Sequence, residues 1–236
     1  MSPPLQKVGV HFHLGVDYRI FDCMSVEVAP LRPTHTVRGL RSKKKLKTRL
    51  AIEDAALDLF AEHGFDATSV EQIAALAEVS MTTFFRYFPT KADVVLTNWG
   101  EGLPALQTAI AERPPDERDL VAIRRAIEEE WVVSVDPQRT VRIARAVATS
   151  PLLRGLSYEV GERWLASISG ALAWRHGDAA ADRRCTITAR VALEAWAQAV
   201  ETWIADGAES DLSAAVARTF DLVAELARDW MEEHEQ

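Results

Sequence analysis

The chain has 236 residues, of which 48% are hydrophobic and 26% charged. This length and composition exclude a collagen-like or low-complexity chain and allow a sizeable core in one or two domains. The formal net charge of −8, taken as one sum, argues against a nucleic-acid partner. Cys23 and Cys185 form no CxxC pair, and no uncharged apolar run reaches the roughly 18 residues of a membrane-spanning helix. We therefore expect a cytoplasmic protein without disulfides or a membrane partner.

The charge is distributed unevenly along the chain. Seven of the twelve residues in 38–49 are basic and none is acidic, whereas residues 99–236 carry 15 basic and 24 acidic side chains. A basic segment beside an acidic body is an asymmetry typical of a nucleic-acid-binding end. We expect three parts: a flexible tail at 1–40, a DNA-binding domain at 41–97 and a helical body at 98–236.

The first 37 residues contain four prolines and no sustained helical or strand period, so we expect little fixed structure there. Whether the native protein begins at Met24 is left open, and N-terminal mass spectrometry would decide it. His11 and His13 have no cysteine or third histidine beside them, so we expect no metal site and no cofactor.

A first amphipathic helix is predicted over about 45–63. Its apolar residues follow the i, i+3, i+4, i+7, i+8 spacing, and Gly64 stands where a left-handed cap would end the helix and fold Phe65 back on Phe60. Thr68 and Glu71 predict a capping box at the start of a second helix. Ser80 is a favourable N-cap for a third helix over 81–88. A helix followed by two short helices around a turn is typical of a helix-turn-helix DNA reader.

At this point the sequence resembles the N-terminal domain of the TetR family of transcriptional repressors over roughly residues 43–96. The resemblance implies an all-α protein of about nine helices, with a three-helix DNA-binding domain followed by a helical ligand-binding and dimerisation domain. The matching residues are Arg49, Ile52, Ala55, Ala56, Leu59, Phe60, Gly64, Phe65, Thr68, Ser69, Val70, Ile73, Ala74, Val79, Ser80, Thr83, Phe84, Phe85, Arg86, Tyr87, Phe88, Pro89, Thr90 and Lys91.

Carried over position by position, the resemblance implies two groups of DNA contacts. The recognition helix would contact bases and phosphates through Ser80, Met81, Thr82, Thr83, Phe85 and Tyr87. Phosphates alone would be held by Lys45, Thr48, Arg49, Thr68 and Lys91.

The sequence departs from the family pattern at two of these positions. Glu78 stands where the family usually has Gly, so Glu78 must tolerate a strained backbone or the turn must differ. Phe85 stands where the family usually has Tyr, so the hydroxyl contact to phosphate is missing. Met81 and Phe85 also fit a helical core stripe, and a purely solvated basic arm is the alternative for residues 38–47.

The body is predicted to be helical throughout. A helix from Thr90 onward should be interrupted near Gly102, and further helices are expected at about 116–133, 137–149, 152–175, between Gly177 and Gly207, and at 210–231. The last two are apolar around much of their circumference, which predicts a four-helix bundle with a twin copy, a large monomeric core being the alternative. The predicted dimer residues are Val191, Ala195, Ala199, Trp203, Val216, Phe220 and Val223.

All seven tryptophans lie in the body, and some could line an apolar ligand cavity. We take Trp99, Trp131, Trp164 and Trp174 as candidates. The resemblance implies that a small molecule bound there releases DNA. A weaker match, in residues 84–91 and 113–116, is to a subgroup with acyl-CoA-like ligands.

The expected function is that of a homodimeric repressor released from a palindromic DNA operator by a small apolar effector. A constitutive or protein-partner-regulated repressor is the alternative. An enzyme is not expected, because the sequence has no GxSxG, P-loop, HExxH or nucleotide-binding glycine motif. Neither the effector nor the operator is named by the sequence.

Overall fold

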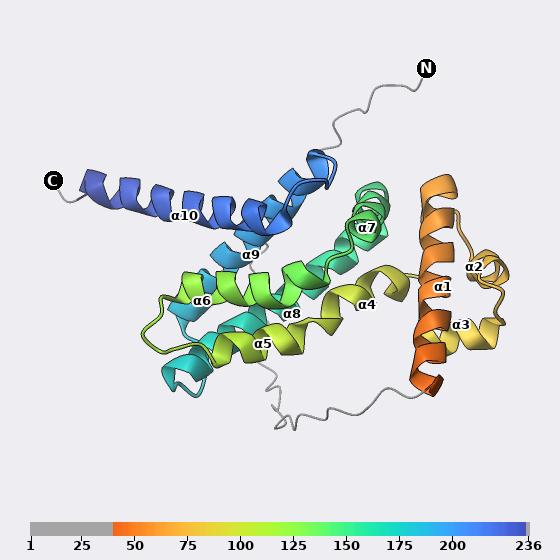
Figure 1. Ribbon diagram of the computed structural model, residues 1–236, viewed down its shortest axis with the longest axis horizontal. Helices are drawn as coiled ribbons and strands as arrows, with labels where there is room; N and C mark the ends of the chain where they lie inside the picture. The colour runs from red at the N-terminus through yellow and green to blue at the C-terminus, as the bar shows by residue number, and fades with distance from the viewer. Residues whose placement is uncertain (1–39, 235–236) are drawn as a thin grey trace, which may run out of the picture.

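The computed structural model describes the backbone of residues 40–234 and the side chains of residues 43–97 and 102–232. Within these residues all regular structure is helical, which confirms the predicted all-α class (Figure 1). None of the described helices is both long and apolar enough to cross a membrane. The predictions for residues 1–39 lie outside the described part of the chain.

Ten α-helices and two short helical turns follow one another in the described residues. In chain order they are α1 (Leu40–His63), α2 (Val70–Leu76), α3 (Met81–Tyr87), α4 (Asp93–Glu101), α5 (Leu103–Ala111), α6 (Asp119–Ala126), the π-helical turn η1 (Ile127–Trp131), the 3-10 turn η2 (Val132–Ser134), α7 (Pro137–Thr149), α8 (Pro151–His176), α9 (Arg183–Ala205) and α10 (Leu212–His234).

The first three helices form as the local sequence predicts, with one correction. Gly64 has a φ of 82° after α1, and the Phe60 and Phe65 rings meet with centroids 5.0 Å apart, as a Schellman ending requires. The capping box of α2 is made by Ser69 and Gln72, not by Thr68 and Glu71. The box is shifted by one residue because the Thr68 side chain turns inward.

The basic segment is helical. We predicted α1 from about Lys45, but the helix begins at Leu40. Lys43, Lys44, Lys45 and Lys47 are therefore exposed along its first turns instead of lying on a loose arm.

Gly102 separates α4 from α5, as predicted, so the linking segment contributes two helices and the total exceeds the nine expected. The indole Nε1 of Trp131 donates to the Gly102 carbonyl at 3.4 Å. A Cβ atom at residue 102 would lie 3.1 Å from the Trp131 ring. A side chain at residue 102 would therefore have to displace the Trp131 ring by a few tenths of an ångström. Trp131 itself ends the π-helical turn η1, which replaces the last part of the single helix predicted over 116–133.

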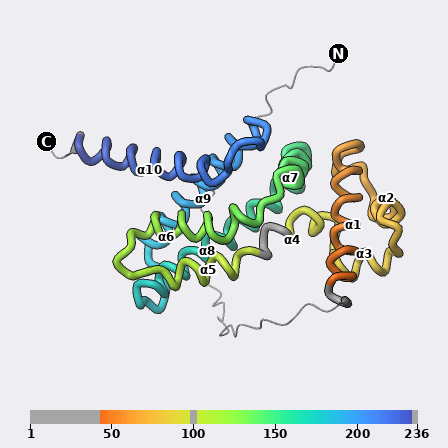
Figure 2. Tube along the Cα trace, viewed as in Figure 1, coloured from red at the N-terminus to blue at the C-terminus, as the bar shows by residue number. Residues whose placement is uncertain are grey.

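The described residues pack around two hydrophobic cores. One lies in the body between α5, α6, α8, α9 and the start of α10. The other lies under α1, α3 and α4, and it also takes Ile143, Ala146 and Val147 from α7 and Leu153 from α8. The predicted domain boundary at residue 98 falls inside α4, and the small domain's core is completed by residues far beyond it (Figure 2).

Two helices have distinctive positions. Figure 1 shows α7 standing between the body and α1, and α7 contacts both α1 and α8. α10 packs on α9 along its first half, while its second half projects beyond the body as an arm. From Leu222 to the last described side chain every residue except Val223 is exposed.

The turn between α2 and α3 contains a strained residue. Glu78 has a φ of 53°, and its amide and that of Val79 bond the Ala75 and Ala74 carbonyls. This is a Schellman ending whose left-handed position carries a side chain where Gly is preferred. Holding a non-glycine residue there costs about 1 kcal/mol.

We therefore expect Glu78→Gly to stabilise the protein by about 1 kcal/mol, which for a chain of this size raises the Tm by about 2–4 °C. Thermal unfolding followed by circular dichroism would measure the shift. Ala75→Gly, at an exposed position inside α2, is the matched control and should lower the Tm instead. Equal destabilisation by both substitutions would contradict the strain argument.

Candidate functional site

The recognition helix α3 has one buried side and one open side. Phe84 and Phe88 have no exposed surface, so they anchor the helix on the core as predicted. Since each residue of an α-helix advances by about 100°, Thr82 and Arg86 point away from these anchors. Both are exposed, and Phe85 beside them is 49% exposed, which excludes the core position that we left open for it.

The remaining α3 side chains border this open side. Met81, Thr83 and Tyr87 are half-buried. Ser80 caps the helix by accepting from the Thr83 amide at 3.1 Å, and the two hydroxyl oxygens lie 3.0 Å apart. Ser80 is thus committed to holding the start of α3.

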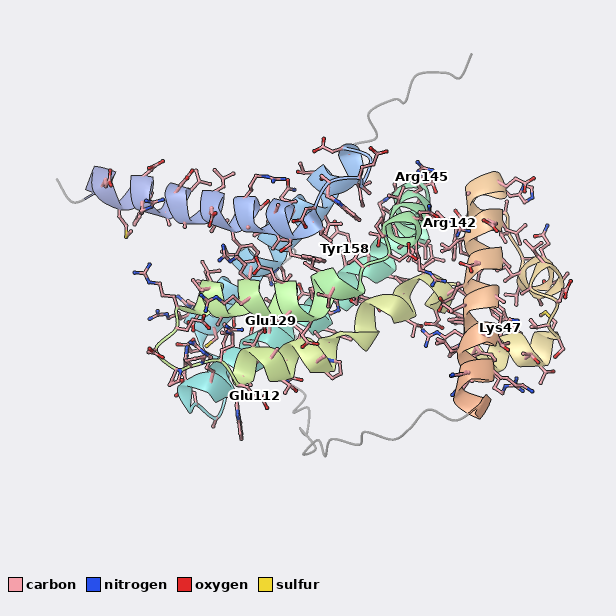
Figure 3. The ribbon with its side chains drawn as sticks, in the orientation of Figure 1. Lys47, Glu112, Glu129, Arg142, Arg145 and Tyr158 are labelled. Carbon is pink, nitrogen blue, oxygen red and sulfur yellow. The ribbon has the colours of Figure 1, made fainter. Side chains whose placement is uncertain are left out.

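Basic side chains from α1 lie near the recognition helix. Lys47 points outward from α1 on the side of α3 (Figure 3), and Lys45 is exposed on the same helix. The Thr48 hydroxyl donates to the Lys44 carbonyl at 3.1 Å, within its own helix. The exposed lysines and the outer side of α3 are together the candidate surface for a polyanion.

Three predicted phosphate contacts have other roles in the structure. The Thr68 side chain is buried, and its hydroxyl donates to the Gly64 carbonyl at 2.8 Å and approaches the Leu59 carbonyl at 3.3 Å. The Arg49 guanidinium bonds Glu53 at 2.8 Å and lies over the Phe88 ring. We correct these two predictions: the Thr68 hydroxyl and the Arg49 Nε hold the fold together.

Lys91 is the third. Its Nζ donates to the carbonyls of Phe65 and Thr68 at 2.5 and 2.6 Å and lies 4.2 Å from the centroid of the Phe65 ring. Burial lowers the pKa of Lys91 below its ordinary value, and the charge of Asp66 partly opposes this shift. The ammonium ties the loop after α1 to the segment before α4, and its predicted phosphate contact stays a prediction.

An ionic contact joins α1 to α7, and we call it the α1–α7 clasp: Glu53, Asp54 and Asp58 on α1 with Arg139 and Arg142 on α7. Arg139 contacts the buried Glu53 carboxylate at 2.6 Å and Asp54 at 3.4 Å. Arg142 contacts the Asp58 carboxylate and donates to the Asp54 carbonyl at 3.0 Å. Figure 3 shows Arg142 between the two helices.

The body contains a cavity of about 250 Å³ bounded by α7, α8 and α9, with Leu212 at one end. Most of its wall is apolar. On α7 the wall is formed by Thr140, Ile143, Ala144 and Val147, which alternate along the helix with the arginines of the clasp. The same helix therefore borders the cavity and holds the DNA-binding domain.

The predicted tryptophans are only partly at this cavity. Trp164 lines it, whereas Trp131 stacks behind the wall, 4.6 Å from Trp164 and 5.4 Å from Trp196 between ring centroids. Trp174 is 75% exposed and lies outside the cavity, so that prediction is wrong. The Trp99 side chain lies outside the described residues.

A few polar groups of the cavity lining could orient a bound ligand. The Trp164 Nε1 is buried, and no described residue accepts its proton. Arg190 and Arg154 both line the cavity. Arg190 contacts Glu162 at 3.6 Å, and Arg154 donates to the Ala148 carbonyl at 2.5 Å. Tyr158, labelled in Figure 3, is 41% exposed, which places it at the open side. An apolar ligand with a hydrogen-bond acceptor and an anionic end fits this distribution.

The predicted dimer residues are mostly internal. Five of the seven are at most 6% exposed in a single chain and belong to its own core: Ala195, Ala199, Trp203, Val216 and Phe220. We correct that prediction, because these side chains have almost no surface to offer. Val191 and Val223 are half-buried. The apolar side chains that the body leaves exposed on α9 and α10 are Ile187, Leu222, Leu226, Trp230 and Met231.

Several residues of the candidate site were not predicted from the sequence. Arg86 was not chosen, although its spacing of four from Thr82 places both on one side of α3. The clasp was also missed, although Asp54 and Asp58 lie four apart and Arg139 and Arg142 three apart, each pair on one face of its helix. Trp196 also lines the cavity, but nothing in its sequence context distinguishes it from the other tryptophans.

Two family models match the chain. The model described as bacterial regulatory proteins, tetR family, matches residues 52–97, and the MftR C-terminal domain model matches residues 117–227. The first covers the second half of α1 with α2, α3 and the start of α4, and the second covers the helices that bound the cavity.

Curated relatives are transcriptional regulators. TcmR of Streptomyces glaucescens is 37% identical over 105 residues, a match that spans 44% of this chain and 46% of TcmR, less than half of that protein's length. The putative mycofactocin biosynthesis regulator MftR of Mycobacterium tuberculosis is 28% identical over 186 residues, 77% of this chain and 91% of MftR.

Solved structures share the fold. FadR of Bacillus halodurans has a TM-score of 0.52 at 20% identity, covering 79% of this chain and 96% of that one. FadR of Bacillus subtilis, solved with stearoyl-CoA, has a TM-score of 0.51 at 19% identity, covering 73% and 96%. The helix-turn-helix geometry, the two family models and these relatives agree: the chain belongs to the TetR family of DNA-binding transcriptional regulators.

Proposed function

We propose that this regulator is a homodimeric repressor that binds an inverted repeat and leaves it when an apolar effector fills the cavity. The observation that carries the proposal is the double role of α7, whose Ile143 and Val147 line the cavity while Arg139 and Arg142 hold α1. A ligand that displaces α7 must displace α1 as well or break the clasp.

We propose a regulatory role without catalysis, and the relatives support this proposal because they are transcriptional regulators. Cytoplasmic localisation stays a prediction and agrees with this role.

We propose that the second copy packs on the exposed apolar side of α9 and α10. Leu222, Leu226, Trp230 and Met231 are each about half exposed or more, and they lie along one helix that projects from the body (Figure 1). Leu222, Leu226 and Trp230 recur every four residues and so share one side of the helix, and an exposed apolar side of this kind marks an interaction site. Two copies joined here would present two recognition helices to two half-sites of an inverted repeat.

The effector that the cavity favours is an acyl compound with an anionic head. A cavity of about 150 Å³ holds benzene, so 250 Å³ accommodates a longer apolar chain. The Trp164 N–H would donate to a carbonyl oxygen, and Arg154 and Arg190 would face phosphate or carboxylate groups. A FadR of similar fold was solved with stearoyl-CoA, so we propose the acyl-CoA class for this chain.

Selection from a random duplex library should enrich an inverted repeat bound by two protomers, as measured by sedimentation. On that duplex Lys47→Ala should weaken binding and lower the magnitude of the slope of log K against log salt by about 1.8, because each of the two protomers loses one phosphate contact. Glu62→Ala, exposed near the other end of α1, is the control and should leave the slope unchanged. Enrichment of no sequence would contradict the proposal.

The cavity is tested with Ala197→Phe, which places a ring in the space between α8 and α9. We expect affinity for lauroyl- or stearoyl-CoA, followed by tryptophan emission, to fall about ten-fold because the space is overfilled. Free coenzyme A serves as the headgroup control, and Gln198→Phe, exposed at the next position, as the matched variant. If neither acyl-CoA binds the unaltered protein, the constitutive alternative is favoured.

The clasp is tested with Arg142→Met, which keeps the aliphatic stem and removes the charge. Effector and DNA should each still bind, but the factor by which effector weakens DNA binding, commonly about 5–150-fold, should fall several-fold. DNA anisotropy with and without effector measures this factor. Arg145→Met on the same helix, exposed and outside the clasp (Figure 3), should leave it unchanged. An unaltered factor in Arg142→Met would exclude the clasp as the coupling element.

A further inference from the structure

The open side of the recognition helix is unusually poor in side chains that read bases by paired hydrogen bonds. α3 consists of Met81–Tyr87 and contains no Asn, Gln, Lys, Asp or Glu. Its outermost residues are Thr82 and Arg86, with Phe85 beside them. Arg86 is therefore the one α3 side chain that can make a bidentate contact with guanine.

The exposed apolar surface on α3 is held in a fixed position. Phe85 is 49% exposed, and its ring meets the fully buried Phe84 edge-on, with centroids 5.4 Å apart and an interplanar angle of 86°. The Thr83 hydroxyl is engaged with Ser80 at 3.0 Å. A half-exposed ring on a buried anchor is a preformed apolar contact surface, since it needs no ordering on binding.

The major groove of DNA offers one apolar group, the C5-methyl of thymine, and Phe rings and Thr methyl groups are the side chains that contact it. We propose that α3 reads its operator largely through thymine methyl groups, with Phe85 and Thr82 as the specificity-determining residues. This inference rests on the proposed DNA-binding function and names the base chemistry that the operator must present.

The test uses the full chain and the inverted repeat obtained by selection. Each thymine is replaced in turn by deoxyuridine, which removes only the methyl group, and affinity is measured by fluorescence anisotropy. Loss of one buried methyl contact corresponds to about a four-fold weaker affinity, and loss in both half-sites to about sixteen-fold. We expect such losses at one or two positions of each half-site.

Two variants assign the contact. Phe85→Ala should bind more weakly and lose most of the discrimination between thymine and deoxyuridine at one position, and Phe85→Leu should restore part of it. Arg86→Met, exposed on the same side of α3, is the matched control: it should weaken binding but keep the discrimination. Because Phe85 lies outside the core, unchanged thermal unfolding would show that these variants keep their fold.

The outcomes separate this inference from the function on which it rests. If selection enriches no duplex, the proposed DNA-binding function fails. If a duplex is enriched but deoxyuridine binds as well as thymine at every position, readout by Arg86 at guanine replaces the methyl contacts and the inference is overturned. Discrimination that survives in Phe85→Ala at every position would remove Phe85 from the assignment.

Discussion

The structure depends on one buried charge. The Glu53 side chain on α1 is 2% exposed, and a carboxylate at such a site must be paired. Arg49 pairs it from the same helix and Arg139 from α7, at 2.8 and 2.6 Å. Removing one partner of a buried ion pair costs about 3–5 kcal/mol. Separating α7 from α1 would therefore leave the buried Glu53 carboxylate with Arg49 as its remaining described ion-pair partner.

This constraint gives α7 its place between two sites. Its arginines face α1, and its small and branched residues complete both the small domain's core and the wall of the cavity. Any ligand that moves α7 away from α8 would strain the ion pairs of the clasp. These ion pairs are either formed or broken, so the response has two states. Exposed apolar side chains outside these contacts include Phe85 and those of the α10 arm, for which DNA and a second copy are the proposed partners.

Much of the fold is readable from the sequence because its signals are local. Gly64 ends α1 with the predicted left-handed cap, Ser80 begins α3, and Gly102 separates α4 from α5. Pro137 begins α7 as predicted, and α7 ends at Thr149, before Ser150. Caps and helical periods depend on residues within one or two turns, so a single sequence contains them. At Glu78 the family resemblance left a strained backbone or a different turn open, and the φ of 53° decides for the strained backbone.

The sequence by itself determined the all-helical class, the helix-turn-helix and the basic face. Only the tertiary structure decided which side of each broadly apolar helix is internal: Trp203 and Phe220 face the core, while Leu226 is exposed. It also decided the role of Lys91, whose carbonyl partners lie 26 and 23 residues earlier. Periodicity shows that a helix has an apolar side, but which side is buried depends on neighbours distant in sequence, and these meet only in the folded chain.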